Sequence, residues 1–211
     1  MVKNAIERKN LLGMPKDEKF SFFDVFLIAL IIILLINVFV QTVWLSPVEV
    51  SGTSMEQTLQ NGDWLLIDKL ADYKRGDIVV FKATKNDNYI KRVIAVEGDE
   101  LYSVDGIVFI KVKGSDAFVE LEEDYAFYDT ELLAHQKKPK DIPLTVIEKD
   151  KIFVLGDNRW GSKDSRQIGP VSVGAIIGVV PKWAVEKRNS YAWYFNFVKK
   201  INLWVNETFG F

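Results

Sequence analysis

The chain has 211 residues, a formal net charge of −2 and a pI of about 5.6. This balance excludes a broadly basic surface, so no nucleic-acid partner is expected. The chain has no cysteine and one histidine, His135, which excludes disulfides, a thiol nucleophile, cysteine-based zinc sites and two-histidine metal sites. We therefore expect no metal ion, and we expect His135, in a lysine-rich polar stretch, to be solvated.

The first element expected is a membrane span over residues 25–45. These residues carry no formal charge, and as a helix they would extend about 30 Å, the thickness of a bilayer core. The stretch ends in Val-Trp-Leu-Ser-Pro rather than in the small residues of a signal-peptide cleavage site. The sequence therefore predicts a retained anchor and contact with the lipid bilayer.

The distribution of basic residues predicts the orientation of this anchor. Five precede it, and the next one after it is Lys69; the five are Lys3, Arg8, Lys9, Lys16 and Lys19. Basic residues favour the cytoplasmic side. Residues 1–24 are therefore expected to form a cytoplasmic tail, and residues 46–211 an extracytoplasmic domain of a single-pass cell-membrane protein.

Residues 46–211 are expected to form a mainly antiparallel β domain. Short runs rich in Val, Ile and aromatic residues predict strands, and Gly and Asp turn signals separate them. The predicted strands cover residues 64–67, 77–81, 89–96, 107–112, 152–155 and 175–180. Asp105-Gly106 predicts a tight hairpin.

Two segments do not fit the strand pattern. Residues 115–143 carry an acidic cluster followed by lysines, and we expect a solvated insertion rather than a calcium or partner site, because the acidic spacing follows no metal-loop pattern. Residues 190–211 are rich in aromatic residues but too short and too interrupted by lysines for a second span. They are expected either on the membrane surface or packed on the domain, and the sequence leaves both open.

Ser54 is the candidate nucleophile. It lies in Ser-Gly-Thr-Ser-Met at residues 51–55, just after the expected span, where a turn or a cap would be the ordinary interpretation. A serine hydroxyl needs a base to take its proton, and His135 is poorly suited. The remaining option is a lysine that burial keeps neutral, because burial disfavours the charged ammonium.

Lys91 is the lysine best suited to that role. It occurs in Tyr-Ile-Lys-Arg-Val-Ile-Ala-Val at residues 89–96. Strand alternation puts it on one face with Val93 and Ala95, and puts Arg92 on the other. On this stretch alone, a solvated lysine on a strand would be the simpler interpretation.

Four stretches, in order, resemble the signature motifs of type I signal peptidases. They are Ser-Gly-Thr-Ser-Met-Glu-Gln-Thr-Leu at 51–59, Gly-Asp-Trp-Leu-Leu-Ile-Asp-Lys at 62–69, residues 89–99, and Gly-Asp-Asn-Arg-Trp-Gly-Ser-Lys-Asp-Ser-Arg-Gln-Ile-Gly at 156–169. The expected anchor and topology agree with that family. The resemblance runs from about residue 22 to residue 181.

The resemblance implies roles for individual residues. Ser54 corresponds to the nucleophile, Lys91 to the general base, and Ser162 to the serine whose hydroxyl orients the lysine. Ser165 is less suitable, since the spacing from Gly156 favours Ser162. Four further positions are implied to hold the site together: Asp157, Arg159, Asp164 and Arg166, the last two as an ion pair.

Two positions depart from the family's usual pattern. Gln57 replaces a proline, which removes a turn constraint but no catalytic group. Gly52 replaces a serine that donates to the oxyanion in one branch, and it resembles the arrangement common in Gram-positive-type members. The oxyanion hole would then use the backbone N–H of Ser54 and a second donor, for which Ser51 and Thr53 are candidates.

The resemblance also implies the reaction. The family removes N-terminal signal peptides from secretory precursor proteins, cutting after small residues at the −1 and −3 positions, without a cofactor. We expect residues 47–52 to pair with the extended precursor peptide.

Two other classes of protein share part of this pattern. Self-cleaving SOS-type repressors share the Ser/Lys chemistry, but they carry a DNA-binding domain where this chain has an apolar span. A non-catalytic, membrane-anchored β module derived from a signal peptidase would be expected to lack Ser54 or Lys91, and both are present.

Overall fold

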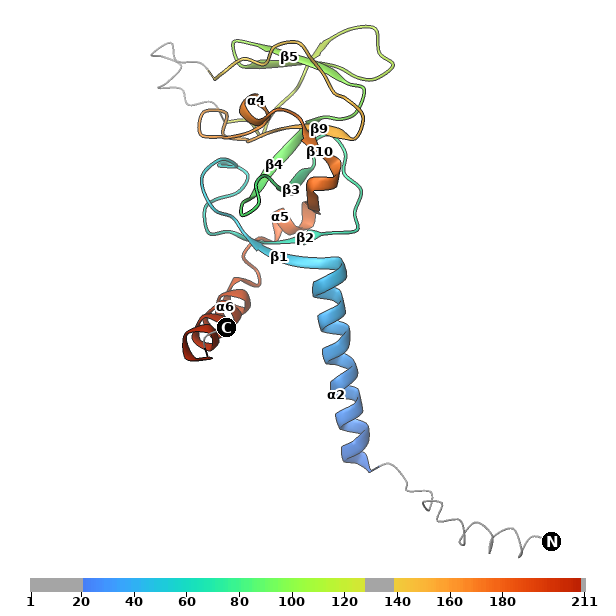
Figure 1. Cartoon of the computed structure of the whole chain (residues 1–211), viewed down its shortest axis with the longest axis vertical. Helices are drawn as coiled ribbons and strands as arrows, with labels where there is room; N and C mark the ends of the chain where they lie inside the picture. Colours follow the sequence, from blue (N-terminus) through green and yellow to red (C-terminus); the bar gives the residue numbers. More distant parts are fainter. Residues whose placement is uncertain (1–20, 128–138, 210–211) are drawn as a thin grey trace, which may run out of the picture. The chain divides into compact units, whose positions relative to one another are not determined.

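The structure, a computed structural model, describes residues 21–127 and 139–209 (Figure 1). The chain divides into two compact units, Met1–Val40 and Gln41–Phe211. The cytoplasmic tail expected over residues 1–24 lies almost wholly outside the described residues, as do His135 and its lysine-rich neighbours.

The apolar N-terminal segment is helical. Helix α2 spans Phe22–Phe39 and begins with a capping box, in which the Ser21 side chain accepts from the Phe23 N–H and the Asp24 side chain accepts from the Ser21 N–H. A π-helical turn, η1 (Val40–Trp44), continues it, which gives an apolar segment of 23 residues, Phe22–Trp44. Its length of about 34 Å suits a bilayer core. The helix begins three residues before the predicted span, and Leu45 already belongs to the first strand.

The main sheet of the second unit has seven antiparallel strands in the order β1-β2-β11-β3-β4-β9-β10. Their bounds are β1 Leu45–Glu49, β2 Trp64–Asp68, β3 Ile78–Lys82, β4 Asn88–Ala95, β9 Lys151–Leu155, β10 Val171–Ser172 and β11 Ile176–Val180. The mainly antiparallel β fold is confirmed. All the strands predicted for this sheet are present, within one residue at either end.

A register shift between Val93 and Ala95 interrupts β4. Val93 packs with Val79 and Phe81 in one buried cluster, whereas Ala95 packs with Ile94 in another. The prediction that Ala95 shares a face with Lys91 and Val93 is therefore wrong, because the bulge breaks the alternation there.

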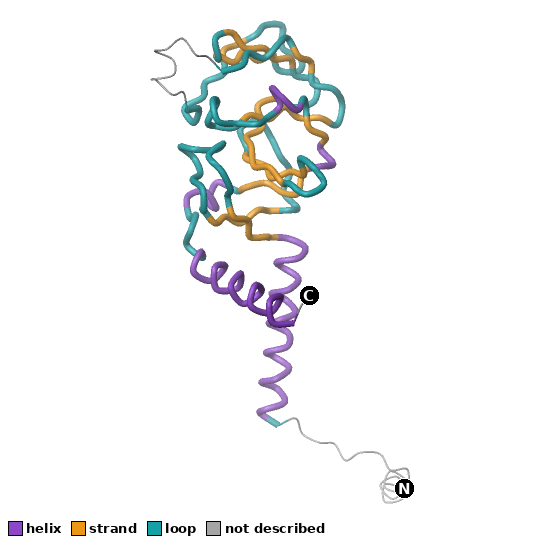
Figure 2. Tube along the Cα trace, turned by 60° about the vertical axis from the view of Figure 1, so that its left-hand side comes forward, coloured by secondary structure: helices purple, strands orange, loops and turns teal. Residues whose placement is uncertain are grey.

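A second sheet has the strand order β7-β6-β5-β8. The strands are β5 Glu100–Val104, β6 Ile107–Lys111, β7 Val119–Glu120 and β8 Thr145–Val146. The predicted Asp105-Gly106 hairpin joins β5 and β6, with φ of 56° and 85° at the two turn residues. This sheet lies at the end of the domain opposite β1 and β2 (Figures 1 and 2). A buried cluster that includes Leu101, Val108 and Phe153 joins the two sheets.

The described part of residues 115–143 packs against the domain. It contributes β7, a bridge from Phe127 to Asn158, and an ion pair from Glu123 to Arg159 in which both side chains are almost fully buried. The acidic residues Asp116, Glu120, Glu122 and Asp124 are exposed, as expected for a solvated segment, and only Glu123 departs from that expectation, because its side chain has a buried basic partner. Residues 128–138 lie outside the description.

Helices complete the second unit. They are α4 Ser165–Ile168, the short 3₁₀ turn η2 Val173–Ala175, α5 Lys182–Glu186 and the long C-terminal α6 Ala192–Phe209. Helix α6 lies next to the end of the domain that carries β1 and β2 (Figure 1).

Candidate active site

Ser54 lies on the loop between β1 and β2. Met55 and Leu59, with exposures of 1% and 0%, anchor this loop in the core, while Ser54 itself is half-buried. Gly52 enters the loop with φ of 90°, a value that favours glycine, and its N–H donates to the Asn61 Oδ1 at 2.8 Å. The loop is therefore fixed on both sides of Ser54.

Lys91 projects from β4 to the same point. Its side chain is almost fully buried, and its Nζ donates to the Ser54 Oγ at 2.7 Å and to the Ile90 carbonyl oxygen at 2.8 Å. Burial lowers the pKa of Lys91 from 10.5 to about 8, although the charges of Asp164 and Asp157 oppose the change. A substantial fraction of this lysine is therefore neutral near neutral pH.

Asp157 ties three segments together on the other side of β4. Its carboxylate accepts from the Arg92 Nε at 2.9 Å and from the Arg92 Nη2 at 2.6 Å. The hydroxyl of Thr58, on the loop that carries Ser54, donates a hydrogen bond to the same carboxylate at 2.5 Å. The loop that carries Ser54 is thus linked to β4 and to the loop after β9. Arg92 lies on the face of β4 opposite Lys91, as predicted. No role for Arg92 or Thr58 was predicted from the sequence.

Gly156 and Asn158 contact the backbone of the loop that carries Ser54. The Asn158 N–H donates to the Ser54 carbonyl oxygen at 3.1 Å, and the Asn158 Nδ2 donates to the Thr53 carbonyl oxygen at 3.2 Å. A Cβ at position 156 would lie 2.4 Å from the Ser54 carbonyl oxygen and 2.2 Å from the Ser162 Oγ. Only glycine fits so close to the backbone of the nucleophile.

Asp164 and Arg166 form a bidentate ion pair, with Oδ1–Nε and Oδ2–Nη2 distances of 2.9 and 2.7 Å. Burial would raise the pKa of the Asp164 carboxyl, but the hydrogen bonds and charge of Arg166 outweigh it and hold the pKa below its usual value. Asp164 also accepts from the Gly156 N–H at 3.1 Å. Arg159 donates to the Gly156 carbonyl oxygen at 3.0 Å and pairs with Glu123. These side chains support the loop around Gly156.

Ser162 is buried beside Gly156. Within normal hydrogen-bond geometry its Oγ has no partner among the described residues, although it lies near enough to Asp164 to help lower that residue's pKa. The predicted orienting bond from Ser162 to Lys91 is therefore not formed in this structure. The other candidate, Ser165, accepts from the buried Val154 N–H at 3.0 Å and supports β9.

The candidate oxyanion donors line the entrance to the site. The Ser54 N–H makes no hydrogen bond to any described residue, and Ser51 and Thr53 are exposed on the groove wall. Gln57 adopts φ of 86°. Proline has a fixed φ near −65°, so the turn here differs from one built on the family's usual proline.

A groove of about 620 Å³ lies beside the Ser54–Lys91 pair. Its walls are residues 48–54, residues 88–91, Val80, Gly161 and Lys163. Among the described residues, β1 pairs only with β2, and residues 88–91 of β4 pair only with β3. Each wall thus offers an unpaired strand edge to the groove. No three His, Cys, Asp or Glu side chains in the described part of the chain gather to hold a metal ion.

Comparison with known proteins finds relatives over most of the chain. A family model described as "Signal peptidase, peptidase S26" matches residues 22–183. Signal peptidase IB of Staphylococcus aureus strain Mu50 is 34% identical over 170 residues, which cover 72% of this chain and 82% of the relative. Signal peptidase I of Bacillus caldolyticus is 35% identical over 141 residues, which cover 62% and 74%. A crystal structure of a signal peptidase I from Enterococcus faecalis V583 is 28% identical, covers 53% of this chain and 98% of that one, and has a TM-score of 0.40.

The chain belongs to the signal peptidase family, peptidase S26. It is of the type I class, which are serine endopeptidases that remove signal peptides. The predicted family and enzyme class are confirmed.

Proposed function

We propose that this chain removes the signal peptides of secretory precursors by a serine–lysine mechanism, with Ser54 as the nucleophile and Lys91 as the general base. The observation that supports the proposal most directly is the 2.7 Å distance between the Lys91 Nζ and the Ser54 Oγ. Burial lowers the pKa of Lys91 to about 8, so neutral Lys91 can accept the Ser54 proton near neutral pH.

The proposed reaction has two halves. Neutral Lys91 takes the Ser54 proton as the Oγ attacks the scissile carbonyl carbon. The resulting oxyanion is stabilised by the Ser54 N–H, with Ser51 or Thr53 as the second donor. Lys91 returns the proton to the leaving amine, which frees the mature protein. Lys91 then takes a proton from water as the water oxygen attacks the acyl-enzyme, and it gives that proton to the Ser54 Oγ as the Oγ–C bond breaks and the signal peptide leaves with a new carboxylate.

Ser162, Asp157, Arg159, Asp164 and Arg166 have supporting roles in this proposal. They fix the loop that packs against the Ser54 backbone at Gly156. The hydroxyl of Ser162 is buried beside this contact. In this proposal, a small rotation of the Ser162 side chain on substrate binding would bring its hydroxyl to Lys91 and orient the lysine.

The precursor would bind in the groove as an added β-strand. The unpaired edges of β1 and of the first half of β4 are the two edges to which an extended peptide can hydrogen-bond. Alternate side chains of such a peptide face the same wall. Val48, Val80 and Ile90 contribute apolar surface there, which favours small apolar side chains at the −1 and −3 positions.

The anchor would place this chemistry at the membrane. We propose that α2 crosses the cell membrane once, with the N-terminus in the cytoplasm and the β domain outside. The basic residues before the span support this orientation. The same placement would bring the groove to precursors whose apolar signal segment still lies in the bilayer. No metal or organic cofactor takes part in the proposed steps.

The test is cleavage of a precursor with an Ala-x-Ala site by the full chain in detergent micelles, from pH 6 to pH 10. Ser54→Ala and Lys91→Met are expected to abolish cleavage. Matched controls are Ser115→Ala, on an exposed loop, and Lys82→Met, at an exposed position of β3. Cleavage that persists in either site variant would refute the mechanism. An inactive wild type would favour the alternative of a non-catalytic β module.

A further inference from the structure

Helix α6 has two chemically different faces. At about 100° per residue, its large apolar side chains fall together on one face. The opposite face is mostly polar, and Phe195 and Leu203 also lie on it. The apolar face carries Trp193, Tyr194, Phe197, Ile201 and Trp204, and the polar face carries Asn196, Lys199, Asn202 and Asn206.

The polar side of α6 contacts the β domain. The Trp64 Nε1 donates to the Asn196 Oδ1 at 3.1 Å, and the Lys199 Nζ pairs with the Glu49 Oε2 at 2.5 Å. Phe195, on the same face between Asn202 and Asn206, stacks on the Trp64 ring with centroids 5.3 Å apart. The helix is thus attached through the side that a helix on a soluble domain normally turns to water.

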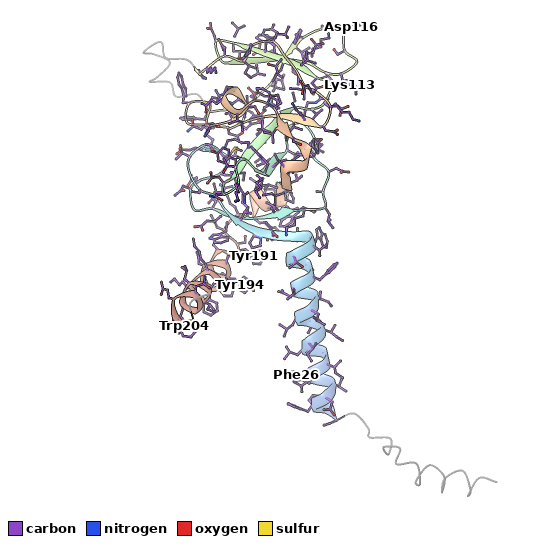
Figure 3. All side chains as sticks on the ribbon, in the orientation of Figure 1. Phe26, Lys113, Asp116, Tyr191, Tyr194 and Trp204 are labelled. Atoms are coloured by element: carbon purple, nitrogen blue, oxygen red, sulfur yellow. The ribbon has the colours of Figure 1, made fainter. Side chains whose placement is uncertain are left out.

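The apolar face is consequently left uncovered. Trp193 is 73% exposed, Trp204 60%, Phe197 58% and Ile201 43%. Tyr194 and Trp204 are among the side chains that stand out from α6 (Figure 3). A continuous apolar stripe of this kind on a helix marks an interaction surface.

The chain itself indicates what covers this stripe. The apolar span ends at Trp44, which is fixed to the domain: its Nε1 donates to the Asp68 Oδ2 at 3.1 Å, and its carbonyl oxygen accepts from the Lys69 N–H at 2.8 Å. Strand β1 follows directly, and the attachment points of α6 are Glu49, at the other end of β1, and Trp64, its partner in β2. Both attachment points of α6 therefore lie within about one strand length, roughly 17 Å, of the point where the chain leaves the apolar span.

We propose that α6 lies on the bilayer surface, with its apolar face at the boundary of headgroups and acyl chains. Trp and Tyr favour this depth, and Lys200, next to Trp193 at the edge of the apolar face, is a cation suited to anionic headgroups. The span already holds the domain at the bilayer, so this second contact forms at high effective concentration. Helix α6 lies beyond the residues that the family model matches, 22–183, and the inference does not depend on the proposed catalytic mechanism.

The absence of cysteine from the chain allows a direct test. Phe197→Cys puts a single thiol on the apolar face, and Asn206→Cys puts one on the opposite face as the matched control. Each full-length protein is labelled with an environment-sensitive fluorophore and reconstituted in vesicles of phosphatidylcholine and phosphatidylglycerol. Quenching by spin-labelled lipid and by aqueous iodide is measured at each position, and near-UV circular dichroism checks the fold.

We expect lipid quenching to be several-fold greater at position 197 than at position 206, and iodide quenching to show the reverse order. Strong iodide quenching at both positions would overturn the proposal, since the stripe would face water. Protection of position 197 from both quenchers would also overturn it, in favour of a protein partner or a second copy. Strong lipid quenching at both positions would mean that α6 is inserted into the bilayer, which contradicts a surface location. None of these readouts requires cleavage, so the result is separable from that of the catalytic test.

Discussion

Replacing Lys91 by methionine should stabilise the fold at neutral pH while it removes catalysis. The folded-state pKa of Lys91 is about 8, because burial disfavours its charged form, against 10.5 for the ordinary group. Between these two values the unfolded chain binds more protons than the folded chain, so the stability of the wild type rises with pH in that window. The free-energy cost of burying protonated Lys91 is fully present below about pH 8.

The size of the effect follows from the two pKa values. Keeping the protonated lysine buried costs about 3 kcal/mol at pH 7. Methionine has a similar length and no charge, so the Lys91→Met variant avoids this cost. Relative to that variant, the wild type should gain about 1 kcal/mol between pH 7 and pH 9, and any constant difference in packing cancels in the comparison.

Denaturant unfolding of both full-length proteins in the same detergent, followed by tryptophan fluorescence at several pH values, measures this change. Lys82→Met removes one positive charge from an exposed strand position and serves as the matched control. In parallel, the wild-type kcat/KM should rise about tenfold per pH unit below pH 8 and level off above it. A stability difference between wild type and Lys91→Met that stays constant from pH 7 to pH 9 would refute the reasoning.

Four further substitutions, at three positions, test the support of the site. Gln57→Gly should stabilise the chain by about 1 kcal/mol in denaturant unfolding, because residue 57 has φ of 86°, whereas Gln57→Pro should destabilise it by about 3 kcal/mol or more; equal stability of the two would contradict this. Gly156→Ala should cost about 1–3 kcal/mol and most of the cleavage activity, since its Cβ would lie 2.4 Å from the Ser54 carbonyl oxygen; wild-type kcat would show that the loop can move freely. Asp157→Leu should cost about 3–5 kcal/mol by leaving Arg92 buried without its carboxylate, and a thermal scan showing little change would argue against a structural role for the pair.

The strands with continuous apolar runs could be predicted from the sequence. Residues 64–68 and 78–82 are rich in Val, Ile and Leu between glycine turns, and both strands lie where expected. β1 was not assigned to the sheet: Pro47 weakens the strand pattern, and the residues follow an apolar helix directly. The two-residue strands β7, β8 and β10 are too short to show any period.

The site also contains some residues that could be predicted from the sequence and others that could not. Ser54 and Lys91 were found because motifs with a known spacing carry them, and the structure brings their side chains together. The pair of Arg92 with Asp157 joins residues 65 positions apart, and no local pattern reveals it. Glu123 seemed part of a solvated acidic cluster, because its buried partner, Arg159, lies 36 positions away in the chain.

The orientation of α6 was beyond the reach of the sequence for a different reason. Its pattern is amphipathic, and amphipathicity alone does not say whether the apolar face meets protein or lipid. The contacts of Trp64 with Phe195 and Asn196 decide which side meets the domain.

The direct passage from the apolar span into β1 limits how far Ser54, the proposed nucleophile, can be from the proposed membrane span. Ten residues separate Trp44 from Ser54, and even a fully extended chain of that length spans at most about 36 Å. The span and β1 therefore act as a short tether of fixed maximum length. A precursor whose apolar segment remains in the bilayer needs no more than about ten extended residues to bring its cleavage site to the serine. Sites much farther along a secreted protein come within reach only if that protein folds back towards the membrane, so the tether itself selects bonds near the membrane before any side chain is recognised.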